Sequence, residues 1–70
     1  MIKEEDLLGL YYTRDKHGNT FEIKINCETY SEKWDGKYYL FINKKLIKAY
    51  KYKTALTEYV RLNYNTTIMI

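Results

Sequence analysis

Residues 20–28 alternate between apolar and polar side chains, and this pattern limits the possible folds more than any other feature of the chain. The apolar residues at every second position are Phe21, Ile23, Ile25 and Cys27. Because successive side chains of a strand point to opposite faces, the pattern predicts a strand with one face in a core and the other in water. A strand of this kind needs partner strands, so the chain is expected to contain a sheet.

Three further runs rich in aromatic and apolar residues predict the partners of this strand. They are Leu10–Thr13, Tyr38–Ile42 and Leu46–Tyr52. Asp35-Gly36 is a hairpin dipeptide because glycine tolerates a positive φ, and Asn43-Lys44 predicts a two-residue turn because asparagine tolerates the left-handed region. The gaps between the runs are short, which favours an antiparallel meander.

The apolar spacing changes to a helical one from Thr54, which we expect to be the N-cap. One side of the helix is predicted to carry Ala55, Leu56, Tyr59, Val60 and Leu62. The 70 residues are therefore expected to form one α+β domain: a small antiparallel three- to four-stranded meander sheet (about 10–52) with one C-terminal helix (about 54–64) packed on one face. The apolar tail, 66–70, is expected to add an edge strand or to cover the core.

Charge is divided unevenly along the chain. Residues 1–36 carry eight acidic and five basic residues, whereas residues 37–70 carry one acidic residue, Glu58, and seven basic ones. The net charges of the two parts are therefore −3 and +6. Lysines and aromatic residues alternate from Lys37 to Lys53, and a cationic surface that bears tyrosines is suited to hold a polyanion.

A two-residue turn at Asn43-Lys44 would pair Ile42 with Lys45, Phe41 with Leu46, Tyr39 with Lys48 and Lys37 with Tyr50. One face of this hairpin would carry core residues, namely Tyr38, Leu40, Ile42, Ile47 and Ala49. The other would carry the basic aromatic set Lys37, Tyr39, Phe41, Leu46, Lys48, Tyr50 and Tyr52. The residues predicted to bind a partner are Trp34, Lys37, Tyr39, Phe41, Lys44, Lys45, Lys48, Tyr50, Lys51, Tyr52 and Lys53.

Three interpretations of this basic aromatic face remain open. Its lysines could neutralise phosphates while its rings stack on bases. It could instead bind a protein, since tyrosine and phenylalanine are enriched in interface cores. The chain's own tail or a second copy of the chain could also cover it, and in the second case the protein would be a homo-oligomer.

No residue pattern indicates catalysis, so the protein is not expected to be an enzyme. His17 lies in a predicted polar turn and Cys27 at the far end of the following strand, which would span ~23 Å at ~3.3 Å per residue, too far for a nucleophilic pair. No Cys/His spacing predicts zinc and no glycine-rich loop predicts a phosphate cofactor, so neither a metal nor a cofactor is expected. Trp34, in a predicted loop, either caps the thin core or anchors a partner.

The remaining features concern location and origin. The chain has one cysteine, no cationic and apolar leader at its N-terminus, and no apolar run of ~20 residues, so we expect a cytoplasmic protein without a membrane contact. Lysine, isoleucine, asparagine and tyrosine are abundant, and their AT-rich codons favour an AT-rich bacterium or one of its phages or mobile elements.

In its order of three strands and a helix, with Tyr52-Lys53-Thr54 at the helix entry, the segment 20–62 resembles the small arm-binding domains of phage-type integrases. That resemblance implies a three-stranded sheet laid against DNA. In size and lack of catalytic residues the chain is similar to phage inhibitors of host defence such as anti-CRISPR proteins. The leading expectation is a binding module for nucleic acid or a nucleoprotein; the alternative is a stoichiometric inhibitor or adaptor that binds a nucleic-acid-handling host protein.

Overall fold

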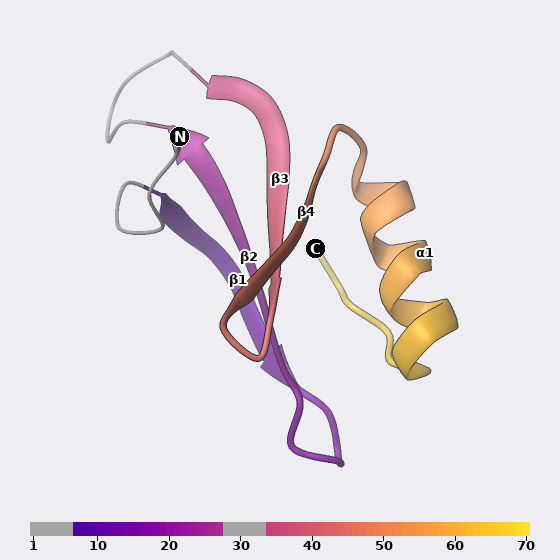
Figure 1. The fold of residues 1–70 in the computed structure, drawn as a ribbon. Coiled ribbons are helices and arrows are strands. Elements are labelled where there is room, and N and C mark those ends of the chain that lie inside the picture. The colour runs from indigo at the N-terminus through magenta and orange to yellow at the C-terminus, as the bar shows by residue number, and fades with distance from the viewer. Residues whose placement is uncertain (1–6, 28–33) are drawn as a thin grey trace.

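The structure, a computed structural model, describes residues 7–27 and 34–70, apart from the side chains of Cys27 and Trp34. Within these residues the elements are β1 (Leu8–Arg14), β2 (Thr20–Cys27), β3 (Trp34–Ile42), β4 (Lys45–Tyr50) and α1 (Lys53–Tyr64). Each strand pairs antiparallel with the next, in the order β1-β2-β3-β4 (Figure 1). The predicted α+β class, the antiparallel meander and the C-terminal helix are confirmed.

The main core lies between the sheet and α1. Its buried members come from three strands, the helix and the tail: Phe21, Ile23, Leu40, Ile42, Tyr50, Leu56, Val60 and Ile68. The alternation in β2 has the predicted effect, because Phe21 and Ile23 are fully buried whereas their neighbours Glu22 and Lys24 are only partly so. Burial of these side chains is the main favourable term for so small a domain.

The β3–β4 turn is the predicted one. Asn43 and Lys44 have φ values of 52° and 68°, the left-handed pair that a two-residue hairpin turn requires. Ile42 pairs with Lys45 and Phe41 with Leu46, as predicted. The side chain of Asn43 also accepts a hydrogen bond from the backbone N–H of Thr20 at 3.0 Å, which fixes the turn to the start of β2.

Beyond Leu46 the predicted register is wrong. A bulge at Ile47 puts one extra residue into β4, so that Leu40 pairs with Lys48, Tyr39 with Ala49 and Tyr38 with Tyr50. A shift of one residue exchanges the two faces of a strand. The last part of β4 therefore turns Tyr50 toward the helix and into the core, and Ala49 toward the opposite face.

The dipeptide Asp35-Gly36 is not the predicted hairpin turn; it lies inside β3. Between the pairs Ile25–Tyr38 and Cys27–Trp34, β3 has three residues and β2 has one. Gly36 has a φ of 78°. The positive φ that glycine tolerates, on which the predicted turn was based, is therefore found at this irregularity within the strand. β3 bends strongly along its length (Figure 1).

The helix begins one residue earlier than predicted. Tyr52, in an extended conformation, is the N-cap and makes no side-chain capping bond, so the assignment of Thr54 as N-cap is wrong. Leu56 and Val60 are buried as predicted, but Ala55 and Leu62 are exposed. α1 packs mainly against β3, β4 and the tail, and its last residue, Tyr64, contacts Phe21 of β2, so a narrow stripe at i and i+4 is enough to cover the sheet.

Asn65, with a φ of 52°, ends α1 in the left-handed conformation that commonly terminates helices. The tail then returns between the helix and the sheet (Figure 1). No strand is assigned to it; Ile68 is 5% exposed, and the backbone N–H of Met69 donates to the Tyr11 hydroxyl at 3.4 Å. No helix within the described residues is long and apolar enough to cross a bilayer.

Candidate functional site

Three of the aromatic residues predicted to bind a partner are buried. Tyr39, Phe41 and Tyr50 are 6%, 4% and 8% exposed, so their ring faces are not available for stacking. They also do not share a face: the bulge at Ile47 puts Tyr50 in the core under α1, whereas Tyr39 and Phe41 lie on the other side of the sheet. The prediction of one exposed face that carries all three rings is wrong.

Tyr39 is held by a carboxylate on its own strand. Its hydroxyl donates to Oδ2 of Asp35 at 2.5 Å, and Oδ1 of the same carboxylate accepts the backbone N–H of Lys37 at 3.0 Å. Asn26 on β2 donates to Oδ2 at 3.5 Å. Asp35 therefore stabilises the irregular start of β3 and gives the buried hydroxyl its partner.

These contacts shift the pKa values of both groups. Burial, followed by the hydrogen bond and the negative charge of Asp35, raises the pKa of Tyr39 from 10.0 to about 12. Burial raises the pKa of Asp35, but the hydrogen bonds from Tyr39, Lys37 and Asn26 outweigh it, and the pKa lies below its ordinary value. Both shifts favour the observed pair, a neutral tyrosine that donates to an ionised carboxylate.

The Tyr39 shift predicts a loss of stability in alkali. A group with a raised folded-state pKa stabilises fully below its unfolded pKa, and that contribution disappears as pH rises through the folded pKa, here between 10.0 and about 12. Urea titrations across this window should show a steeper loss of unfolding free energy for the wild type than for Tyr39→Phe. Tyr12→Phe, at a position 56% exposed, is the control and should retain the wild-type slope. Equal slopes for the wild type and Tyr39→Phe would contradict the assignment.

Phe41 is covered on its side of the sheet by a cation. The Nζ of Lys24 lies 5.1 Å from the centre of the Phe41 ring, and the same ammonium lies 3.9 Å from the Glu22 carboxylate. Glu22 pairs with Phe41 across β2 and β3, so the three side chains share a face. This arrangement stabilises the sheet and leaves Phe41 no free ring surface.

The exposed part of the predicted site is a series of lysines along β4, the edge strand of the sheet, which we call the lysine edge. It consists of Lys44, Lys45, Lys48, Lys51 and Lys53, all exposed. Lys45, Lys48 and Lys51 follow one another at intervals of three residues, or ~10 Å along an extended strand. The lysine edge runs from the β3–β4 turn to the first residue of α1.

Aromatic rings position three of these ammonium groups. The Nζ atoms of Lys48, Lys51 and Lys53 lie 5.4, 6.0 and 5.8 Å from the centres of the Tyr50, Tyr52 and Tyr38 rings, respectively. Such contacts contribute ~0.5–1 kcal/mol at exposed sites and restrict the flexible lysine stems. Tyr50 was predicted to contact a ligand but is buried and orients Lys48, and Tyr38 was predicted to lie in the core. Tyr52, also predicted to contact a ligand, is itself 64% exposed.

No carboxylate in the described residues neutralises the lysine edge. Its five lysines make no ion pair there. Glu58, the one acidic residue beyond Gly36, is bound by Arg61 on α1. A row of lysines without a carboxylate partner among the described residues creates a positive potential along this side of the domain.

Two predicted residues stand apart from the lysine edge. Lys37 is exposed on β3 near Asp35. Trp34 is the first residue of β3 and pairs with Cys27, so it is not in the predicted loop; its side chain lies outside the described part of the chain. Both precede the β3–β4 turn and belong to the other end of the strand.

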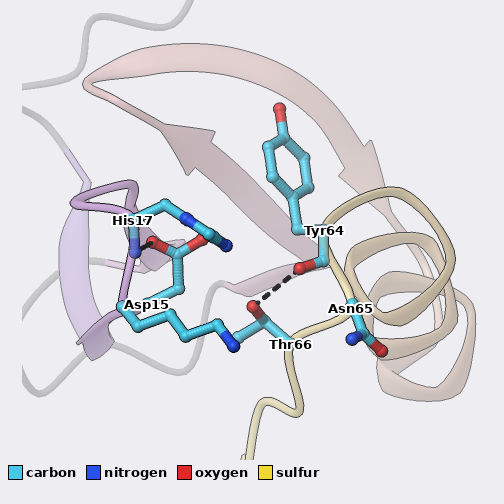
Figure 2. A pocket seen from close by; sticks show the side chains of 6 residues that line it. Asp15, His17, Tyr64, Asn65 and Thr66 are labelled. Atoms are coloured by element: carbon cyan, nitrogen blue, oxygen red, sulfur yellow. Dashed lines mark hydrogen bonds between the residues drawn. The ribbon is translucent and has the colours of Figure 1, made fainter.

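Sequence reasoning missed an open groove of about 390 Å³ between the β1–β2 turn and the end of α1 (Figure 2). Its lining is Asp15, Lys16, His17, Tyr64, Asn65 and Thr66. The Asp15 carboxylate accepts the side-chain amide of Asn19 and the backbone N–H groups of Asn19 and His17, and these hydrogen bonds lower the pKa of Asp15. Both carboxylate oxygens of Asp15 thus already accept hydrogen bonds from within the β1–β2 turn. The two segments lie far apart in sequence, and no signal in either predicted that they meet.

The described residues contain no group of three or more His, Cys, Asp or Glu side chains that could hold a metal ion. The chain matches no protein-family model, and no curated protein or solved structure matches it significantly. The function therefore has to be argued from the lysine edge itself.

Proposed function

We propose that this protein is a non-enzymatic module that binds the phosphate backbone of nucleic acid through the lysine edge. The observation that carries the proposal is the run of five exposed lysines, Lys44 to Lys53, without a carboxylate partner in the described residues. Lysines that neutralise phosphates release condensed counterions, and this term supplies most of the affinity of sequence-independent binding.

The side chains around the lysines favour backbone contact over base recognition. Arginine presents a planar fork of donors that suits bidentate recognition, whereas lysine offers a compact point charge. Arg61, the nearest arginine in sequence, is held by Glu58. Tyr52 remains as one exposed ring beside Lys51 and Lys53, and it could stack on an unpaired base. We therefore propose binding that depends little on sequence.

The binding test is a charge reversal within the lysine edge. Lys48→Glu is expected to weaken binding of a fluorescent oligonucleotide at least ~10-fold, because it removes a phosphate contact and adds repulsion. Fluorescence anisotropy with single-stranded and duplex probes gives the dissociation constants. Lys48→Gln, which removes the charge alone, should have an intermediate effect.

The matched control is Lys16→Glu, the same charge reversal at an exposed position in the β1–β2 turn. It should leave the dissociation constant within ~2-fold of the wild type, since it changes only the net charge. Circular dichroism verifies that each variant is folded. Equal losses for Lys16→Glu and Lys48→Glu, or no binding by the wild type, would refute the proposal.

A second candidate function is binding of a protein with an acidic surface, such as a host nuclease. It is supported by Leu46 and Ile47, which are 54% and 39% exposed between the lysines. A nucleic-acid partner would contact the lysines and Tyr52, whereas the core of a protein interface buries apolar residues such as Leu46. Leu46→Ser would therefore weaken a protein complex and leave oligonucleotide affinity unchanged.

A further inference from the structure

The bulge at Ile47 brings two lysines of β4 to one side of the sheet. Lys45 and Lys48 stand three positions apart and would point to opposite faces in a regular strand. Lys45 pairs with Ile42. Because of the extra residue, Lys48 pairs with Leu40, which lies two positions from Ile42 on the same face of β3. Ile42 and Leu40 are both in the core under α1, so the two lysines share the helix side of this edge strand.

Two tyrosines hold ammonium groups on this same side. Tyr38 and Tyr50 are cross-strand partners, and both pack in or against the core under α1. The Nζ of Lys48 lies 5.4 Å from the centre of the Tyr50 ring. The Nζ of Lys53, the first residue of α1, lies 5.8 Å from the centre of the Tyr38 ring. Lys53 therefore joins the lysines of β4, and together they form a line of cations that can follow one phosphate backbone.

Tyr52 lies at the end of this line and offers ring surface to a base. It is the extended residue before α1, between Lys51 and Lys53. The Nζ of Lys51 lies 6.0 Å from the centre of the ring, and an ammonium covers only one of the two faces of a ring. Since Tyr52 is 64% exposed, its other face remains accessible. A base stacked on that face would have its flanking phosphates close to two lysines.

We propose that the lysine edge binds single-stranded nucleic acid, with an unpaired base stacked on Tyr52 and the backbone along Lys45 and Lys48. This inference rests on the proposed binding of phosphates by the lysine edge, and it specifies the class of nucleic acid. The bases of a duplex are stacked on one another, so Tyr52 could reach one only after the base is extruded at the cost of unstacking. A single strand presents its bases without that cost, and every base has a face that can stack.

α1 does not provide the surface with which a helix reads a duplex. A helix can enter the major groove, where its side chains contact phosphates and base edges. After Lys53 the helix has one basic residue, Arg61, and Glu58 neutralises it on the exposed side. Leu62, 68% exposed, is apolar. The cations that are available to nucleic acid therefore lie along the edge strand and not along the helix.

The test compares a single-stranded oligonucleotide with the duplex of the same sequence, by fluorescence anisotropy of the full chain at one low salt concentration. The wild type is expected to bind the single strand at least ~5-fold more tightly than the duplex. Tyr52→Ala should weaken binding of the single strand ~5- to 100-fold and change binding of the duplex by less than ~2-fold. A wild type that prefers the duplex, or a Tyr52→Ala variant that binds the single strand like the wild type, would overturn the inference.

Matched variants show whether the ring itself is responsible. Tyr52→Phe keeps the ring and should bind the single strand within ~2-fold of the wild type, whereas Tyr52→Leu keeps only apolar volume and should behave like Tyr52→Ala. The Tyr52 side chain makes no capping hydrogen bond, so its replacement removes none from α1. Tyr12→Ala, at a position 56% exposed on the opposite edge strand, is the control and should leave both affinities unchanged.

An abasic single strand, with the same phosphates and no bases, separates this inference from the proposed function. The wild type should bind it more weakly than the normal strand by the factor that Tyr52→Ala costs. If the wild type bound both strands equally and Lys48→Glu weakened both, stacking on Tyr52 would be refuted and phosphate binding would stand. If neither strand bound, or if Lys48→Glu had no effect on either, the proposed function would fail together with the inference.

Discussion

Replacing Phe21 with alanine is expected to leave most of the protein unfolded at room temperature. Phe21 is 0% exposed, and its ring packs edge-to-face against Tyr64, with centroids 5.3 Å apart and planes at 79°. Truncation of a buried phenylalanine costs ~3–5 kcal/mol, and a single core in a domain of this size rarely supplies more than ~3–5 kcal/mol in total. Urea denaturation followed by circular dichroism measures the effect.

Two further variants show whether the loss comes from the core. Phe21→Leu retains most of the apolar volume and should reduce the free energy of unfolding by ~1–1.5 kcal/mol. Leu62→Ala, at a position 68% exposed on α1, should change it by less than ~0.5 kcal/mol. If Phe21→Ala unfolded at the wild-type urea concentration, the packing of β2 against the end of α1 would not be the main source of stability.

The second large effect is the dependence of nucleic-acid binding on salt. If the five lysines of the lysine edge each neutralise a phosphate of duplex DNA, log K falls with log salt at a slope of about −4.5. A fourfold rise in salt then weakens binding ~500-fold. Anisotropy titrations at several salt concentrations give the slope directly.

The same titration with Lys45→Gln/Lys48→Gln tests whether these lysines make the contacts. The removal of two phosphate contacts is expected to reduce the slope to about −2.7. Lys16→Gln is the control and should leave the slope unchanged. Affinity that is equal at low and high salt would exclude phosphate binding by the lysine edge.

The sequence predicted the parts of the fold that depend on local chemistry. β2 was recognisable because one of its faces is buried, which produces a strict alternation from Phe21 onward. Asn43-Lys44 was recognisable because few residues other than glycine adopt the left-handed conformation, and asparagine is one of them. The change to helical spacing from Thr54 predicted α1 to within one residue of its start.

The candidate site was predicted less well because it depends on register. The bulge at Ile47 has no signature in the sequence. An isoleucine between Leu46 and Lys48 is equally compatible with a regular strand. The bulge exchanges the faces of Ala49 and Tyr50, so Tyr50, which was predicted to lie on the exposed face, is buried in the core under α1. The lysines of the lysine edge are exposed despite this shift, because a charged side chain avoids burial regardless of register.

Asp35-Gly36 shows a different limit of sequence reasoning. A glycine after aspartate indicates a position with positive φ. Such a position occurs in a hairpin turn and also in an irregular strand. Only the contact between Asp35 and the Tyr39 hydroxyl distinguishes the two, and that contact depends on the path of the whole strand.

Each of the three strand pairings contains an interruption, near Gly9–Tyr11, Ile25–Cys27 and Leu40–Phe41. At such a point a chain can gain or lose a residue while the strands on either side keep their partners. Short insertions and deletions in homologous chains should therefore accumulate there first. A deletion of Ile47, for instance, would remove the bulge while Lys48 stays paired with Leu40 and Tyr50 with Tyr38, so Tyr50 would remain in the core. Divergence in length at these three positions would thus leave both the topology and the buried face of the sheet unchanged.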